Sequence, residues 1–135
     1  MTVGDAIRFV DTIKPNAFPD EAKILWLSQL EGKLAGEVFL MAPAEIRKFN
    51  YSQLTKTKAT AKVLLVDPPY DDIYIEWLKA QIDHENGEYS KYQNTMQMFN
   101  ERYNEFVAWF AGTYRPADSY YFPHLTKGEK TIEYV

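Results

Sequence analysis

The sequence contains no cysteine, and this one absence excludes several kinds of chemistry. Without a thiol the chain has no disulfide, no thiolate zinc site and no cysteine nucleophile. Long apolar runs are missing as well: none approaches the length of about 18 residues that crosses a membrane, and the N-terminus lacks the basic-then-apolar pattern of a signal peptide. We therefore expect a soluble protein that is made in the cytoplasm and has no membrane partner.

Histidine and glycine are scarce, with two and six copies respectively. They form no phosphate-binding glycine loop, no Gly-x-Ser-x-Gly elbow and no zinc-protease histidine pair. His84 and Glu88 are spaced as two metal ligands on one helix face, but no third ligand is evident, and a solvated helix face explains them better. We expect no enzymatic activity, no cofactor and no metal site.

Aromatic residues are in surplus, with ten Tyr, eight Phe and three Trp. Tyr and Trp combine an apolar body with a polar tip, so they suit both a protein core and a protein–protein contact. The surplus is therefore compatible with an interaction protein and with a tyrosine-rich core. The 135 residues are enough for one domain to bury a core without disulfides or metals, and we expect a single helical domain over residues 1–135.

The stretch 71–110 organises the chain, because its large residues recur at alternating steps of three and four. This is the spacing of a helix that packs along another helix. With Glu85 as its polar member, the row contains Tyr74, Leu78, Ile82, Tyr89, Tyr92, Met96, Phe99, Tyr103, Phe106 and Phe110. Asp71 and Asp72 follow two prolines and favour a helix start at this point.

Asn86 and Gly87 offer a different interpretation of this stretch, a C-cap that splits it into a hairpin. The rhythm stays in phase across the pair, however, which favours one unbroken helix over 71–110. Such a helix is a rod of about 60 Å, longer than a domain of this size is wide, and indicates an assembling protein. If the chain doubles back at the pair, the argument from a rod fails.

A second helix is predicted from about residue 20 to residue 41, ended by Pro43. Within it Gly32 and Gly36 lie four apart, a pair that marks either a close backbone approach by a partner or two tolerated glycines. We predict an all-α small bundle in which the long helix packs against this one. Residues 44–66 have poor periodicity.

A short first helix is predicted to begin after a Thr2 cap. Its apolar row is read as Ala6, Phe9, Val10 and Ile13. At the other end, residues 117–135 show no helical period and suggest an extended C-terminal arm. Its aromatic residues, Tyr120, Tyr121 and Phe122, are candidate interface residues, either on a neighbouring subunit or folded back over the chain's own helices.

The net charge of −4 hides an uneven distribution. Residues 46–66 carry five bases and no acid, whereas 71–110 carries eight acids and three bases. The five basic side chains are Arg47, Lys48, Lys56, Lys58 and Lys62. They are candidates for contact with nucleic-acid phosphates or with an acidic partner, such as the acidic helix of a neighbouring copy; a solvated loop is the plainer alternative.

Three segments together resemble a known family. The first contains PYD at 69–71 followed by Tyr74, WLKAQID at 77–83 and NGEY at 86–89. The second is WLSQLEGK at 26–33, and the third is MFN at 98–100 followed by Tyr103, Phe106 and Trp109. In these the chain, over about residues 20–110, is similar to small virion structural proteins of tailed phages and prophages of Gram-positive bacteria, in particular head–tail connector (neck adaptor) subunits.

The resemblance implies a non-enzymatic, mostly helical subunit with several shorter helices, assembled as a homo-oligomeric ring under the portal. Portal or tail components of the virion are then its partners, and part of each subunit lies near the DNA channel. A different class of function is also open from the sequence: a cytoplasmic helical adaptor or regulatory protein that binds a partner through an aromatic helix face.

Overall fold

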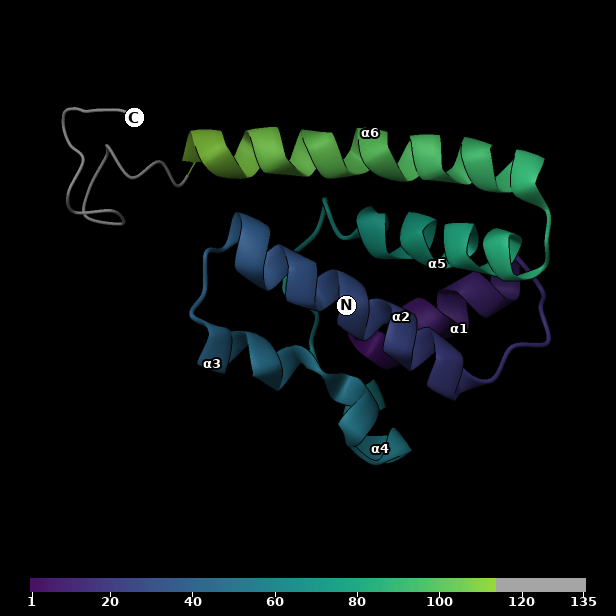
Figure 1. The fold of residues 1–135 in the computed structure, drawn as a ribbon, viewed down its shortest axis with the longest axis horizontal. Helices are drawn as coiled ribbons and strands as arrows, with labels where there is room; N and C mark the ends of the chain where they lie inside the picture. Colours follow the sequence, from purple (N-terminus) through teal and green to yellow (C-terminus); the bar gives the residue numbers. More distant parts are fainter. Residues whose placement is uncertain (114–135) are drawn as a thin grey trace, which may run out of the picture. The chain divides into compact units, whose positions relative to one another are not determined.

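The computed structural model describes residues 1–113, which are mostly helical (Figure 1). The elements in chain order are α1 (Val3–Ile13), α2 (Asp20–Lys33), a π-helical turn η1 (Leu34–Val38), α3 (Pro43–Ile46), the 3-10 turns η2 (Arg47–Phe49) and η3 (Tyr51–Gln53), α4 (Lys56–Thr60), α5 (Asp72–Glu85) and α6 (Tyr89–Thr113). Within residues 1–113 the β-structure is limited to one antiparallel bridge between Thr2 and Val63. The all-α prediction is confirmed.

The chain divides into two compact units, Met1–Arg102 and Tyr103–Val135. The first unit contains α1 to α5 and the first part of α6. The second unit begins with the rest of α6, in which the ring centroid of Phe106 lies 6.3 Å from that of Trp109 and 5.8 Å from that of Phe110.

Helix α1 begins as the sequence predicts, at a Thr2 cap. The Thr2 hydroxyl accepts a hydrogen bond from the Asp5 amide at 3.1 Å, and the Asp5 carboxylate accepts one from the Thr2 amide at 3.0 Å. These two bonds form a capping box, and they hold the pKa of Asp5 below its usual range. The local chemistry of four residues is therefore enough to start this helix.

The apolar row predicted for α1 is wrong in two of its four members. Phe9 and Ile13 are 52% and 47% exposed, whereas the buried row consists of Val3, Ala6, Ile7 and Val10. Two overlapping rows at helical spacing share Ala6 and Val10 in this segment. Contact with α5 buries the row that also contains Val3 and Ile7, and leaves Phe9 and Ile13 at the surface.

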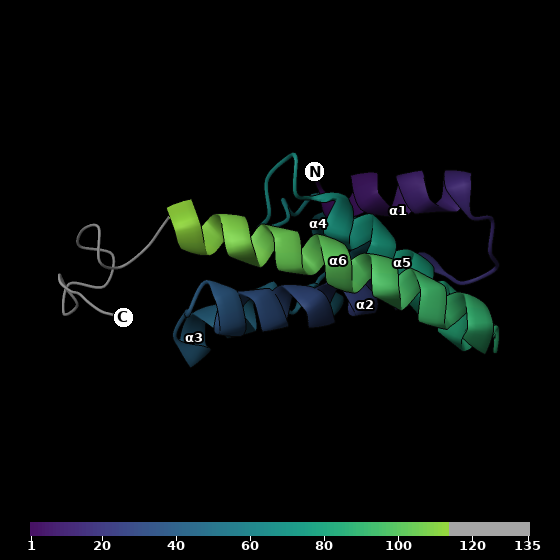
Figure 2. The ribbon, with the colours of Figure 1, turned by 90° about the horizontal axis from the view of Figure 1, so that it is seen from above.

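Helix α5 is the centre of the first unit. It packs against α1 and α2 on one side, and the first part of α6 lies along another side (Figures 1 and 2). Its fully buried side chains include Ile73, Tyr74, Leu78 and Ile82. Each such aliphatic side chain removed from water contributes about 1.5–3 kcal/mol, so this central row supplies much of the driving force for packing.

The prediction of one unbroken helix over 71–110 is wrong, because the chain reverses at Asn86 and Gly87. Gly87 has a φ of +75°, in the left-handed region that favours glycine. The Gly87 amide donates to the His84 carbonyl at 3.0 Å, and the Glu88 amide donates to the Asp83 carbonyl at 2.9 Å. These are the two hydrogen bonds of a Schellman motif, which ends α5. Without one unbroken helix there is no rod, and the expectation of an assembling protein that was based on the rod has no support.

The first part of α6 runs antiparallel to α5. The contacts between them are His84 with Tyr92 (ring centroids 4.9 Å apart), Asp83 with Thr95 (3.1 Å), Trp77 with Phe99 (ring centroids 5.1 Å apart) and Asp72 with Arg102 (3.1 Å). Residue numbers fall along α5 as they rise along α6, so the two form a helical hairpin. Each helix needs an apolar row, which is why the three–four rhythm continues across the reversal and gives no sign of it.

The helix predicted over 20–41 is observed as α2 and the turn η1, which ends at Val38, and Pro43 begins α3 and does not end this helix. A Cβ added at Gly36 would lie 3.3 Å from Cδ1 of Ile46, whereas one added at Gly32 would meet nothing within 4 Å. The close approach expected at this glycine pair is therefore made by the chain's own Ile46, and only at Gly36. Leu40, with a φ of +55°, follows the end of η1.

The hairpin predicts that replacing Gly87 by alanine lowers the free energy of unfolding. Because an L-residue in the left-handed region costs about 1–2 kcal/mol, Gly87→Ala should lower the free energy of unfolding by that amount. Gly32→Ala is the matched control: it lies in a helix with open space around it, so it should be neutral or should stabilise by up to about 1 kcal/mol. Urea denaturation measures both changes. A stabilising Gly87→Ala would contradict the hairpin, since alanine is favoured in an unbroken helix.

Candidate functional site

A buried carboxylate on α2 holds together the part of the fold from which the candidate site is built. Glu31 is fully buried, and its two oxygens accept three hydrogen bonds. Oε1 accepts from the Tyr51 hydroxyl at 3.1 Å and from the Leu65 amide at 3.0 Å. Oε2 accepts from the Tyr74 hydroxyl at 2.6 Å. Glu31 therefore joins α2 to η3, to the extended chain at Leu65 and to α5.

Two further hydrogen bonds complete this cluster. The Tyr74 hydroxyl accepts from the Val66 amide at 2.9 Å, and the Ser28 hydroxyl accepts from the Tyr51 amide at 2.9 Å. Burial raises the pKa of Glu31 although its three donors act to lower it, and burial beside Glu31 also raises the pKa of Tyr51 and of Tyr74. The segment between residues 51 and 66 is thus fixed to α2 and α5 at both of its ends.

Between these two anchors, α4 is held against α1. Ala59 is buried, and a Cβ added at Gly4 would lie 3.1 Å from the Thr60 carbonyl oxygen, so the two backbones approach closely. The Val3 amide donates to the Lys62 carbonyl at 2.9 Å. Thr55 caps α4 by accepting from the Lys58 amide at 3.4 Å. This poorly patterned segment therefore has a defined conformation in the structure.

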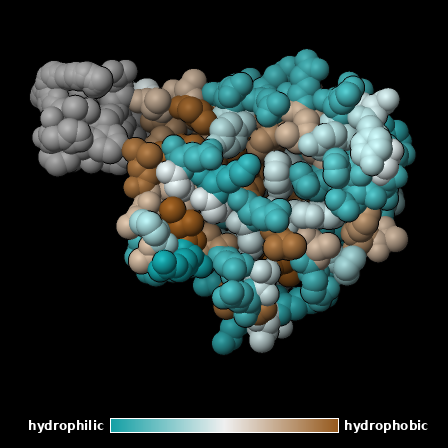
Figure 3. Space-filling model, in the orientation of Figure 1, coloured by the Kyte–Doolittle hydropathy of each residue, from teal (hydrophilic) through white to brown (hydrophobic). Residues whose placement is uncertain are grey.

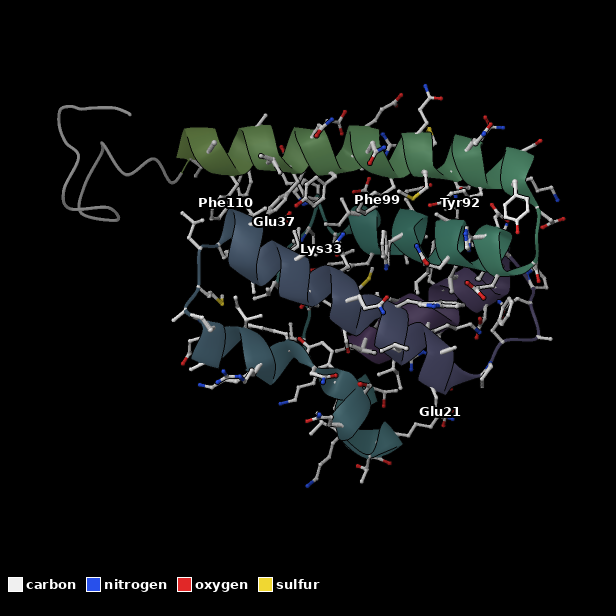
Figure 4. The ribbon with its side chains drawn as sticks, viewed as in Figure 1. Glu21, Lys33, Glu37, Tyr92, Phe99 and Phe110 are labelled. Carbon is white, nitrogen blue, oxygen red and sulfur yellow. The ribbon has the colours of Figure 1, made fainter. Side chains whose placement is uncertain are left out.

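The five predicted basic side chains lie just before the anchored segment or within it. We call these residues, Arg47, Lys48, Lys56, Lys58 and Lys62, the basic surface. All five are exposed. Figure 4 shows several nitrogen-tipped side chains that project from the α3–α4 segment, and Figure 3 shows a mainly hydrophilic surface there. Arg47 and Lys48 belong to η2, Lys56 and Lys58 to α4, and Lys62 follows α4.

Two of the five cations are paired and three are not. Lys48 lies 3.1 Å from Glu45, and Lys56 lies 3.0 Å from Asp20, which raises the pKa of Lys56. Within residues 1–113, Arg47, Lys58 and Lys62 have no ion-pair partner. A shallow hollow is lined by Leu54, Lys58, Ala61 and Lys62. Two of the unpaired ammonium groups therefore belong to one small concavity.

The other candidates from the sequence do not form a site. His84 Nδ1 lies 3.2 Å from the Glu85 carboxylate, while Glu88 pairs with Lys91 at 3.2 Å, so the suggested metal-ligand pair has other partners. No group of three or more potential metal ligands gathers anywhere in the described part of the chain. The tail residues Tyr120, Tyr121 and Phe122 lie outside the described residues.

Sequence reasoning missed Glu31, although a signal was present. Ile24, Leu27, Glu31 and Leu34 follow one another at steps of three, four and three, so the carboxylate is in phase with the apolar row of α2. A charged residue inside an apolar row is buried with its partners or breaks the row. Its partners here come from residues 20 to 43 positions away, which the pattern of α2 alone does not reveal.

No family model, curated protein or solved structure matches this chain. Among the helices within residues 1–113, none is both long enough and apolar enough to cross a membrane.

Glu31 makes a prediction about pH. Its folded pKa is raised, so the native state binds the proton more tightly than the unfolded chain, whose pKa is near 4.5. Its contribution to the free energy of unfolding is therefore lost as pH rises from 4.5 through the folded pKa. Urea denaturation at a series of pH values should show that wild type loses stability relative to Glu31→Gln over this range.

Tyr51→Phe is the control for this pH effect, because it removes one donor and keeps the titrating carboxyl. The variant should be less stable by about 1 kcal/mol and should keep the same trend with pH. If wild type and Glu31→Gln change in parallel from about pH 4 to about pH 7, the native state does not hold this carboxyl in the proposed way.

Proposed function

We propose that this chain is a non-enzymatic structural protein of a phage or prophage virion, a head–tail connector (neck) subunit. In this role it assembles with copies of itself and with other virion proteins such as portal or tail components. The proposal begins from the resemblance over about residues 20–110. The assembly does not depend on a rod, because α5 and α6 are separate helices that form a hairpin.

The observation that carries the proposal is that the three resembling segments meet at one residue, Trp77. Its Nε1 donates to the carbonyl of Trp26 at 2.8 Å, and its ring centroid lies 5.1 Å from that of Phe99. The three residues belong to the segments 77–83, 26–33 and 98–100. The segments that carry the resemblance thus pack together in the core of this chain, as expected of a mostly helical connector subunit.

The surface of α1 supports the assembly part of the proposal. Phe9 and Ile13 lie four residues apart on one face of α1, and about half of each side chain is exposed. An apolar pair of this kind gains free energy when a neighbouring subunit covers it. The exposed basic surface adds charges by which a partner's orientation can be selected.

A second candidate function is a helical adaptor that binds a protein partner through an aromatic helix face, outside any virion. One observation favours it. Tyr89 is 61% exposed at the start of α6, and its ring lies 5.8 Å from that of His84, which also contacts Tyr92. These three rings form an exposed aromatic cluster at the hairpin turn, and aromatic residues are enriched where proteins bind one another.

The two functions predict different masses in solution. A connector subunit should form a closed oligomer larger than a dimer in size-exclusion chromatography with light scattering, alone or with the portal protein encoded beside it. Phe9→Asn with Ile13→Asn should weaken that oligomer, whereas Leu25→Asn, at an exposed apolar residue of α2, should leave it intact. A chain that stays monomeric or dimeric under both conditions, and whose gene has no portal, capsid or tail genes beside it, would favour the adaptor.

A further inference from the structure

We propose that the basic surface binds the phosphate backbone of duplex DNA without regard to base sequence. Its principal contacts are Arg47, Lys58 and Lys62, and the paired Lys48 and Lys56 lie at its margin. The inference names the partner of this surface and takes its biological setting from the proposed virion function. The binding itself is a property of the single chain and is tested separately.

The charges of the three principal residues are not neutralised within the described chain. Residues 46–66 contain no acid, and the two acids that pair with the basic surface, Glu45 and Asp20, do so at Lys48 and Lys56. Small counterions must therefore balance Arg47, Lys58 and Lys62 in solution. A polyanion that replaces its own condensed counterions with these side chains gains free energy from their release.

The sequence also suggested the acidic helix of a neighbouring copy as a partner for the basic surface. Most of the acids over 71–102 are paired within their own chain. The pairs are Asp71 with the N-terminal amine (3.9 Å), Asp72 with Arg102 (3.1 Å), Glu76 with Lys79 (3.2 Å), Asp83 with Lys14 (2.7 Å) and Glu88 with Lys91 (3.2 Å). Five of the eight acids over 71–110 thus have a cation of their own chain beside them. This makes the stretch a weaker partner for a neighbour's basic surface than a polyanion whose counterions are mobile.

The residue types of the basic surface also favour a phosphate partner. Four of the five basic residues are lysine, which is depleted in protein–protein interfaces but serves well as a point charge for phosphate. Tyr51 is buried and Phe49 is half-buried, so the segment offers little aromatic surface on which unpaired bases can stack. These features favour the backbone of a duplex over a protein partner or a single strand.

The short helices of this segment favour contact with phosphates over contact with base edges. The helices α3 and α4, with four and five residues, are too short to lie along a major groove and read base edges. The anchors at Tyr51 and Leu65 nevertheless fix the backbone that carries Lys58 and Lys62, and both side chains line the same hollow. A backbone that is already fixed loses little further conformational entropy on binding, and its exposed cations contact phosphates at any sequence.

Fluorescence anisotropy with a labelled duplex of random sequence, titrated with wild type over a range of salt, tests the inference. Three phosphate contacts predict a slope of log K against log salt of about −3, and a Kd of about 10⁻⁴–10⁻⁶ M at moderate salt. In Lys58→Glu with Lys62→Glu the affinity at low salt should fall at least about tenfold, and the slope should approach about −1.

The matched control is Lys33→Glu with Lys91→Glu, which changes the net charge by the same amount at exposed lysines outside the basic surface. It should lose clearly less affinity than Lys58→Glu with Lys62→Glu, because the equal change in net charge acts on both variants and only the latter removes the proposed contacts. Circular dichroism of both double variants should match wild type, which shows that the exposed substitutions leave the helices folded.

Three results would overturn the inference: no binding at low ionic strength, equal losses in both double variants, or tighter binding of polyglutamate than of duplex DNA at the same salt. The last would assign the surface to an acidic protein partner. None of these results alters the mass measured by light scattering, so failure of the DNA contact and failure of the connector proposal are distinguishable.

Discussion

The structure depends on one buried carboxylate. Taking the charge of Glu31 out of water costs several kcal/mol unless hydrogen bonds replace its hydration. Tyr51, Leu65 and Tyr74 supply those hydrogen bonds, and they come from three separate parts of the chain. The requirement to satisfy Glu31 therefore brings these parts to α2 together. The raised pKa of Glu31 shows that burial outweighs the donors, so this anchor is sensitive to protonation.

The Glu31 cluster and the hairpin hold different parts of the first unit in place. On one side of α5, Tyr74 reaches Glu31 and fixes the chain that carries the basic surface. On another side, Trp77 contacts Phe99 and so sets the first part of α6 along α5. One central helix thus positions both the exposed cations and the resembling segments. Surface charge and exposed apolar residues are what such a scaffold offers to partners, and this is the physical basis of an assembly or binding role.

Local chemistry made part of this fold predictable, and distant contacts made the rest unpredictable. The Thr2 cap and the start of α2 follow from residues next to one another, and the helix over 20–41 follows from its row. The reversal at Gly87 was visible as a glycine, but an apolar rhythm is the same for a rod and for a hairpin, so periodicity favoured the wrong alternative. The basic residues were evident from composition. Which of them stay unpaired depends on acids elsewhere in the fold, and no pattern within the segment contains that information.

The central claim is that Glu31 holds residues 51 to 66 in a fixed conformation, and amide hydrogen exchange at Leu65 and Val66 tests it most directly. The amide of Leu65 donates to Glu31 and that of Val66 donates to Tyr74, although neither residue lies in a helix or strand ladder. Both should exchange nearly as slowly as the Leu78 amide in α5, because opening them requires loss of the buried cluster. Exchange at the rate of an unstructured chain would contradict the account, since it would mean that the carboxylate does not anchor this segment.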